Sequence, residues 1–299
     1  MGTSRIARPI GEWRPQAAVS ALAVVSAFGF LYSGVLATLV HDWWSDDNYS
    51  HGFLIVPLAL YFAWERRARL AAAPPRPSAV GLLLVIASLG VLAAGTLGAE
   101  LFLRRISMLG VAAGSVWFMC GRQHLRILAF PLAFLVLMIP TPAIVFNQIA
   151  FPLQLLASRV GETVLTLAGV PVLREGNVIV LANTSLEIAE ACSGIRSLVS
   201  LLTLAIVYGY FVDRRASMRV LLAVAAIPIA IAANGVRVAG AGLAAAFISP
   251  SAAEGFLHTF SGWLVFVLAV VLLVAVHRVA DRVMPGRLSA AHHAGAGAR

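Results

Sequence analysis

The chain of 299 residues alternates between long apolar runs and short polar connections. Eight runs come near the roughly 20 residues that a helix needs to cross a bilayer. In order along the chain they are residues 17–40, 52–64, 79–98, 106–120, 125–139, 193–212, 220–247 and 257–277. Three of them, 52–64, 106–120 and 125–139, are short for a full crossing, so the count is open by one or two. The pattern predicts an all-α polytopic membrane protein with about eight transmembrane helices.

One long segment between the fifth and sixth predicted helices, residues 141–191, departs from this pattern. The preceding helix should end at Ile139-Pro140-Thr141-Pro142. Residues 143–168 are apolar with polar interruptions, which fits an amphipathic helix on the outer surface or a re-entrant segment. Short strands at 177–181 and 185–189 then predict a small hairpin that leads directly to Cys192.

Composition and charge extend this picture. Hydrophobic residues make up 60% of the chain and charged residues 12%, with no polar block long enough for a separate soluble domain. We therefore expect one domain over residues 1–299, with a frayed tail at about 289–299. The net charge of +9 comes from 22 basic residues, all arginine, gathered in short loops. That distribution indicates membrane topology and argues against a nucleic-acid partner.

The arginines lie in every second loop, at residues 5–14, 66–76, 122–126, 214–219 and 278–287. The alternate loops are mostly acidic. Because cytoplasmic loops carry the excess of arginine, both termini are predicted to be cytoplasmic. The segment 141–191 then faces the opposite, outer side.

This topology predicts on which side of the membrane each cysteine and histidine lies. Cys120 falls near the inner end of one helix and Cys192 near the outer end of another, so no disulfide should join them. A metal site built from cysteines is excluded for the same reason, and we expect no metal and no cofactor. Of the histidines, His41, His51 and His258 can share a membrane face with Cys192.

Cys192, Arg237 and His258 are predicted to lie at a similar depth in the membrane. At a rise of 1.5 Å per residue, Cys192 lies roughly 33 Å from the inner basic cluster on its helix. By that rise Arg237 lies roughly 27 Å and His258 roughly 28 Å from theirs. Asn234 shares a helix face with Arg237 because the two are three positions apart. The sequence therefore predicts a Cys-His-Arg site near the outer edge of the membrane.

The chemistry of each side chain in this site suggests a role for it. The thiolate of Cys192 at a helix N-terminus would be favoured by the helix dipole and would act as the nucleophile. His258 has the titration range of a general acid and base at neutral pH. Arg237 stays charged and could stabilise either the thiolate or a tetrahedral oxyanion, and we favour the oxyanion. The backbone amides of residues 193–195 could also serve an oxyanion.

Structural interpretations of these residues remain open from spacing alone. A membrane cysteine is commonly a small hydrophobe, which suits Cys120, and His258 could simply lie at the interface. Asn234 could form only a hydrogen bond between helices, and His51 could only begin one. Arg196 could pair with a nearby glutamate, Glu187 or Glu190.

Two other classes of function also remain open. In a transporter or lipid-carrier flippase, Arg237 and Asn234 would bind an anionic substrate and Cys192 would be incidental. A noncatalytic membrane scaffold for polysaccharide assembly would need neither the thiol nor the guanidinium.

Three motifs in fixed order carry a family resemblance. They are Ala191-Cys192-Ser193-Gly194-Ile195-Arg196-Ser197, then Asn234-Gly235-Val236-Arg237, then His258 at the start of the final helix. The chain resembles the exosortase and archaeosortase family in these motifs. Upstream, the resemblance takes in Tyr49-Ser50-His51-Gly52, and it extends over about residues 41 to 277.

The resemblance implies a membrane cysteine protease or transpeptidase with Cys192, Arg237 and His258 as catalytic residues. Ser193, Gly194, Arg196, Asn234 and His51 are the supporting residues that lie in the matching motifs. Its substrates would be membrane-anchored exported proteins with a C-terminal sorting signal of the PEP-CTERM kind: a short motif, a transmembrane helix and a basic cluster. The cut would fall at the outer face of the inner membrane, often alongside extracellular polysaccharide production.

Overall fold

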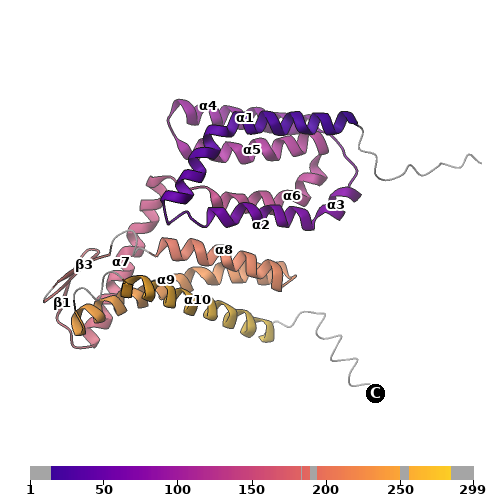
Figure 1. The fold of residues 1–299 in the computed structure, drawn as a ribbon. Helices are drawn as coiled ribbons and strands as arrows, with labels where there is room; N and C mark the ends of the chain where they lie inside the picture. The colour runs from indigo at the N-terminus through magenta and orange to yellow at the C-terminus, as the bar shows by residue number, and fades with distance from the viewer. Residues whose placement is uncertain (1–14, 183, 189–193, 250–255, 284–299) are drawn as a thin grey trace, which may run out of the picture. The chain divides into compact units, whose positions relative to one another are not determined.

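The structure is a computed structural model that describes residues 15–182, 184–188, 194–249 and 256–283. Its elements fall into two compact units, Met1–Pro140 and Thr141–Arg299. Figure 1 shows the order of the helices and strands along the chain.

The first unit is built from helices. They are α1 (Pro15–Ser45), α2 (Gly52–Glu65), α3 (Arg67–Ala72), α4 (Ala79–Leu97), α5 (Leu101–Cys120), α6 (Arg122–Phe134) and the 3-10 helix η1 (Leu135–Met138). α4 and α5 form a closely packed pair, because a Cβ atom on Gly81 would lie only 2.2 Å from the backbone nitrogen of Phe118. Small residues let the two backbones approach this closely.

Polar contacts join α1 to α5 within this unit. The hydroxyls of Tyr32 and Ser107 lie 3.0 Å apart, and Nη2 of Arg105 donates to Oδ2 of Asp42 at 2.6 Å. Arg105 is almost fully buried, so its charge needs the carboxylate of Asp42. α5 begins at Leu101, five residues before the predicted start of this span, where the Glu100 side chain caps it by accepting the N–H of Phe102. The ion pair with Asp42 stabilises Arg105, which the hydropathy pattern excluded from the span.

The second unit combines four helices with a small sheet. They are α7 (Ala143–Leu167), β1 (Val172–Glu175), β2 (Val178–Leu181), β3 (Ser185–Glu187), α8 (Ile195–Val212), α9 (Ala216–Phe247) and α10 (Phe256–Val283). The strand order is β1-β2-β3, with both pairs antiparallel. Buried Leu165 and Ile179 join the sheet to α7, and a second apolar cluster that includes Leu201, Leu222 and Leu273 fills the space between α8, α9 and α10.

The polytopic membrane fold is confirmed. Within the described residues, seven helices are long and apolar enough to cross a membrane: α1, α4, α5, α7, α8, α9 and α10. α2 is apolar but has only 14 residues. The predicted span 125–139 is wrong as one continuous helix, because α6 ends at Phe134 and the chain tightens into η1 before Pro140 and Pro142.

The segment between the fifth and sixth predicted spans is partly as expected. A helix covers Ala143–Leu167 as predicted, and it is long enough to cross a bilayer. The hairpin of β2 and β3 is confirmed, although β3 ends at Glu187 instead of residue 189. β1, whose four residues include Arg174 and Glu175, was not predicted from the sequence.

Candidate functional site

Gly194 places the chain beside α9 at the start of α8. It is the N-cap of this helix, with φ of +81°, and its carbonyl accepts the backbone N–H of Leu198 at 2.8 Å. Glycine is favoured in this left-handed conformation. A Cβ atom there would also lie 2.7 Å from Cγ of Asn234. Both the positive φ and the close contact with Asn234 therefore favour glycine at residue 194, two positions after Cys192.

α8 begins at Ile195, two residues later than the predicted start of this span at residue 193. Cys192 and Ser193 lie outside the described residues. The favoured thiolate of Cys192 at the helix N-terminus is therefore still a prediction. Arg196 is exposed at the second position of α8. Its suggested partners, the Glu187 side chain and Glu190, also lie outside the described part.

Asn234 and Arg237 lie on the same face of α9, as the spacing predicted, and they contact two different helices. Asn234 is 5% exposed and packs on Gly194 of α8. Arg237 is half-buried and lies against Gly262 of α10, where a Cβ atom would be 3.8 Å from its Nη1. α9 therefore joins the N-terminus of α8 to the first turns of α10.

His258 belongs to the first turn of α10, and its side chain lies outside the described part. It is four positions before Gly262, so the two share one helix face. Because Gly262 contacts Arg237, this face of α10 is the one turned toward α9. The backbone of His258 lies one turn, about 6 Å, farther toward the N-terminal end of α10.

An ion pair at the opposite ends of α9 and α10 gives a common reference level for Arg237 and His258. Nη2 of Arg215 at the start of α9 lies 2.5 Å from Oδ1 of Asp281 on α10. From this level, Arg237 is about 33 Å along α9 and His258 about 34 Å along α10, at 1.5 Å per residue. The two positions predicted to act together are therefore at one depth in antiparallel helices.

A shallow apolar groove of about 320 Å³ lies beside Gly194. Its walls come from α7, the first turns of α8 and the middle of α9, and Asn234 is the main polar side chain that lines it. An apolar segment could be held there next to the residues that follow Cys192.

Asn177 holds the chain that leads from the sheet toward Cys192. Its carbonyl accepts the N–H of Ile188 at 3.0 Å, and its Nδ2 donates to the carbonyl of Ile188 at 3.2 Å and to Oε1 of Gln154 at 3.3 Å. Ser158 of α7 adds a hydrogen bond to the carbonyl of Gly176 at 3.0 Å. These residues were not predicted from the sequence, although Asn at the start of a predicted strand, opposite polar positions of a helix, was a usable signal.

His51 lies in the first unit, in the turn before α2. Its Nε2 is 3.1 Å from the carbonyl oxygen of Leu137, and burial lowers its pKa against the opposing effect of this contact. The neighbouring Gly52 packs on Trp43, whose Nε1 donates to the carbonyl of Met138 at 2.9 Å. Since His51 belongs to the other unit, its place on the same membrane face as Cys192 is still a prediction.

The described residues contain no group of three or more His, Cys, Asp and Glu side chains that could hold a metal ion. Cys192 and the His258 side chain are not among them. The prediction of a site that works without a metal or cofactor therefore stays a prediction.

Comparison with known proteins adds one finding. The family model described as transmembrane exosortase matches residues 43–275. This range contains Cys192, Arg237 and His258, and it ends within α10. No curated protein and no solved structure matches the chain.

Proposed function

Because the chain belongs to the transmembrane exosortase family, we propose that it is a membrane-embedded cysteine protease or transpeptidase. It cleaves the C-terminal sorting signals of exported, membrane-anchored proteins at the outer face of the inner membrane. The observation that carries the proposal is the meeting of α8, α9 and α10 at Gly194, Asn234, Arg237 and Gly262.

In the proposed first step, the thiolate of Cys192 attacks the carbonyl carbon of the scissile peptide bond. A tetrahedral intermediate forms, and its negative oxygen is stabilised by the guanidinium of Arg237. His258 then donates a proton to the leaving amine as the C–N bond breaks. The products of this step are a free C-terminal fragment and a thioester on Cys192.

In the second step, water or an amine acceptor attacks the thioester. His258 removes the proton from the incoming nucleophile, and the C–S bond breaks to restore the thiolate. Water gives hydrolysis, and an amine acceptor gives transpeptidation. Both outcomes use the same three residues.

The packing around Arg237 supports its role. A Cβ atom on Gly262 would lie 3.8 Å from Nη1 of Arg237 and 3.9 Å from its Cδ, so this small residue on α10 leaves room for the guanidinium beside the face that carries His258. The guanidinium stays charged, so it would stabilise an oxyanion that develops beside this face of α10.

The apolar groove beside Gly194 supports a hydrophobic substrate. A sorting signal contains a transmembrane helix, and its outer end has to approach Cys192 from within the bilayer. Leu153, Leu156 and Val160 of α7 line the groove on one side. An apolar segment in contact with them would bring the adjacent polar motif to the end of α8.

The orientation follows from the arginine distribution. Both termini are proposed to be cytoplasmic, and the ends of α8, α9 and α10 that carry Gly194, Arg237 and Gly262 then face the outside. A basic cluster at the cytoplasmic end of the substrate would keep its signal in the same orientation. The proposed substrates are proteins of the PEP-CTERM kind, in a cell that exports polysaccharide.

The test is co-expression with a sorting-signal protein from the same genome, followed by immunoblot for the shortened product. Wild type should give this product, while Cys192→Ala and Arg237→Ala at matched abundance should not. Cys120→Ala is the matched control, because it removes the other thiol at the opposite end of a helix in the first unit. Normal shortening by Cys192→Ala would contradict the protease and favour the transporter or scaffold hypothesis.

A further inference from the structure

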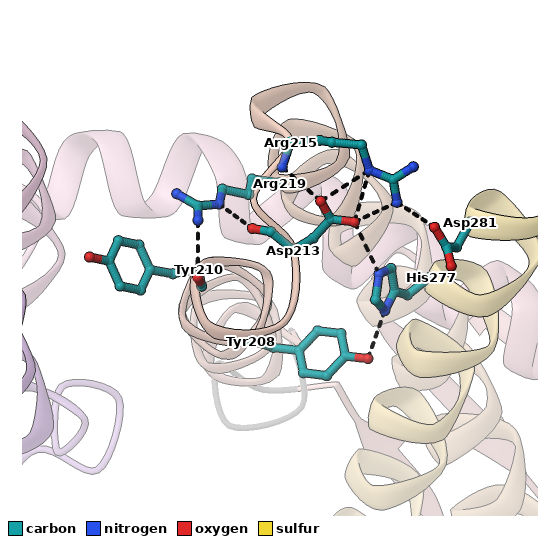
Figure 2. A network of polar contacts seen from close by, with 7 residues as sticks. All are labelled: Tyr208, Tyr210, Asp213, Arg215, Arg219, His277 and Asp281. Carbon is teal, nitrogen blue, oxygen red and sulfur yellow. Dashed lines mark hydrogen bonds and ion pairs between the residues drawn. The ribbon is translucent and has the colours of Figure 1, made fainter. Parts of the chain in front are cut away.

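A second polar cluster joins α8, α9 and α10 at the ends opposite Gly194 and Arg237. Figure 2 shows its seven residues, Tyr208, Tyr210, Asp213, Arg215, Arg219, His277 and Asp281. They come from the last turn of α8, the connection to α9, the first turn of α9 and the last turns of α10. The proposed chemistry uses none of them.

Asp213 is the centre of this inner cluster. Its side chain is 8% exposed, and its Oδ1 accepts the backbone N–H of Arg215 at 2.7 Å. The guanidinium of Arg215 donates to both oxygens, at 3.0 Å to Oδ1 and 2.5 Å to Oδ2. These bonds lower the pKa of Asp213 from 3.8 to about 2, so the carboxylate is charged at neutral pH.

Arg219 fixes the start of α9 against the end of α8. Its Nε donates to the carbonyl of Asp213 at 2.7 Å, and its Nη2 donates to the carbonyl of Tyr210 at 3.0 Å. The guanidinium also lies 4.8 Å from the centre of the Tyr210 ring. The last carbonyls of α8 therefore have hydrogen-bond donors on α9. These contacts fix the axial position of α9 relative to α8.

α10 joins the cluster at two places, one turn apart. Nδ1 of His277 lies 2.8 Å from the hydroxyl of Tyr208, and its Nε2 is 3.6 Å from Oδ2 of Asp213. Asp281, four positions later on the same face, pairs with Arg215 at 2.5 Å. His277 is 8% exposed, so its contacts are shielded from competing water.

The apolar core between these helices fixes their positions along their axes less strictly than the polar cluster does. It is formed by small and aliphatic side chains, including Ala226, Ala230, Ala233, Ala269 and Leu273. Apolar burial is non-directional, and in a bilayer it gives little preference for protein over lipid. Hydrogen bonds and charge pairs depend on distance and angle. Sliding of α10 along α9 would break the inner cluster first.

We propose that His277 and Asp281 are positioning residues that fix the axial register of α10 against α8 and α9. The register sets the depth of His258 relative to Arg237, because His258 lies about 34 Å from Asp281 along the same stiff helix. This inference rests on the proposed function, because it is His258 in the reaction that needs the correct depth. Misplacement of a reacting group by about 1 Å can cost about 100-fold in rate.

The test compares variants of full-length protein in liposomes with a sorting-signal substrate. His277→Ala with Asp281→Ala removes both ties of α10, and His277→Gln with Asp281→Glu keeps hydrogen-bonding groups at both positions. Arg278→Gln is the matched control on the same turn of α10. We expect kcat to fall about 10- to 100-fold in the double alanine variant, with KM unchanged and with recovery in the conservative variant.

A second measurement reports the axial position of α10 relative to α9 and does not depend on substrate processing. A spin label is placed at Leu264→Cys on α10, where the side chain is 52% exposed, in a Cys120→Ser and Cys192→Ser background. A label at Val236→Cys on α9, 56% exposed in the wild type, gives the reference depth. The double alanine variant should change the depth of residue 264 relative to residue 236. If the double variant does not fold, His277→Ala and Asp281→Ala are tested singly, because each removes the contacts of one of the two residues.

The outcomes separate the two proposals. Lost processing with an unchanged label depth, or unchanged processing, would overturn the positioning role. A KM increase without a kcat decrease would also overturn it, because it would indicate a role in substrate binding. Wild-type protein that processes no substrate, together with a shifted label, would overturn the proposed function and not the register. A shifted label with a conservative variant that restores both depth and kcat supports the inference.

Discussion

Gly194 and Asn234 are in such close contact that a Cβ atom on Gly194 would lie 2.7 Å from Cγ of Asn234. The contact joins the N-terminus of α8 to the middle of α9, in a chain position two residues after Cys192. Any side chain at residue 194 would have to displace a buried amide or move the helix start. The contact therefore links the predicted nucleophile to the helix that carries Arg237.

Gly194→Ala should reduce substrate processing at least about 10-fold, because the helix start has to shift. The substitution also places a non-glycine residue at φ of +81°, at a cost of about 1–2 kcal/mol. Gly169→Ala is the matched control, since Gly169 has φ of +76° and open space around it. The measurements are the processing rate and thermal unfolding in detergent. Equal processing by both variants would show that the contact with Asn234 does not matter.

Gly262 should tolerate alanine and reject leucine. A Cβ atom at this position meets Nη1 of Arg237 at 3.8 Å, which is ordinary van der Waals contact, so Gly262→Ala needs no movement. Leucine would extend into the space of the guanidinium and displace it from the face that carries His258. We expect Gly262→Leu to lower kcat about 10- to 100-fold. Gly90→Leu, at a glycine with nothing within 4 Å, should leave kcat unchanged.

The helices could be predicted because membrane insertion depends on local composition. Apolar runs of about 20 residues are stable as helices in lipid wherever the rest of the chain lies. The errors arose where other forces act, as at Arg105, whose charge is offset by Asp42 on a distant helix. The strand β1 was missed because four residues with Arg174 among them give almost no alternating apolar pattern.

One relationship within the candidate site follows from helical periodicity alone. Asn234 and Arg237 share a face because they are three positions apart, and the structure has them on one face of α9. Gly262 gave no signal, since its role depends on how α9 and α10 pack. The tie between Arg215 and Asp281 joins residues 66 positions apart and needs three-dimensional structure to be seen.

Asn177→Ala should destabilise the hairpin that precedes Cys192. The substitution removes the donor to the carbonyl of Ile188, a residue that is 3% exposed, and the bond to Gln154. An unsatisfied buried carbonyl costs about 1–3 kcal/mol, so the unfolding temperature should fall. Processing should also fall, because Ile188 is only four positions before Cys192. Asn147→Ala, at an exposed position of α7, is the control, and equal melting of the two variants would contradict the prediction.

The ionised carboxylate of Asp213 should make stability depend on pH in the acid range. Its pKa is about 2 in the folded protein, against 3.8 for the free group, because Arg215 donates to it. The folded state therefore binds the proton more weakly than the unfolded state. The stabilisation is complete above about pH 4 and is lost as the pH falls toward 2. Thermal unfolding of wild type and Asp213→Asn in detergent at pH 7 and pH 3 measures the difference directly.

Wild type should melt well above Asp213→Asn at pH 7, and the gap should narrow at pH 3. Asp47→Asn, which changes an acidic residue in the turn before α2, controls for the loss of one carboxylate from the first unit. Its difference from wild type should be small at pH 7. A constant gap between wild type and Asp213→Asn at both pH values would mean that the asparagine loses packing or hydrogen bonds and that the charge of Asp213 adds nothing. A narrowing gap would assign the stabilisation to the ion pair with Arg215, the same residue that ties α9 to α10 through Asp281.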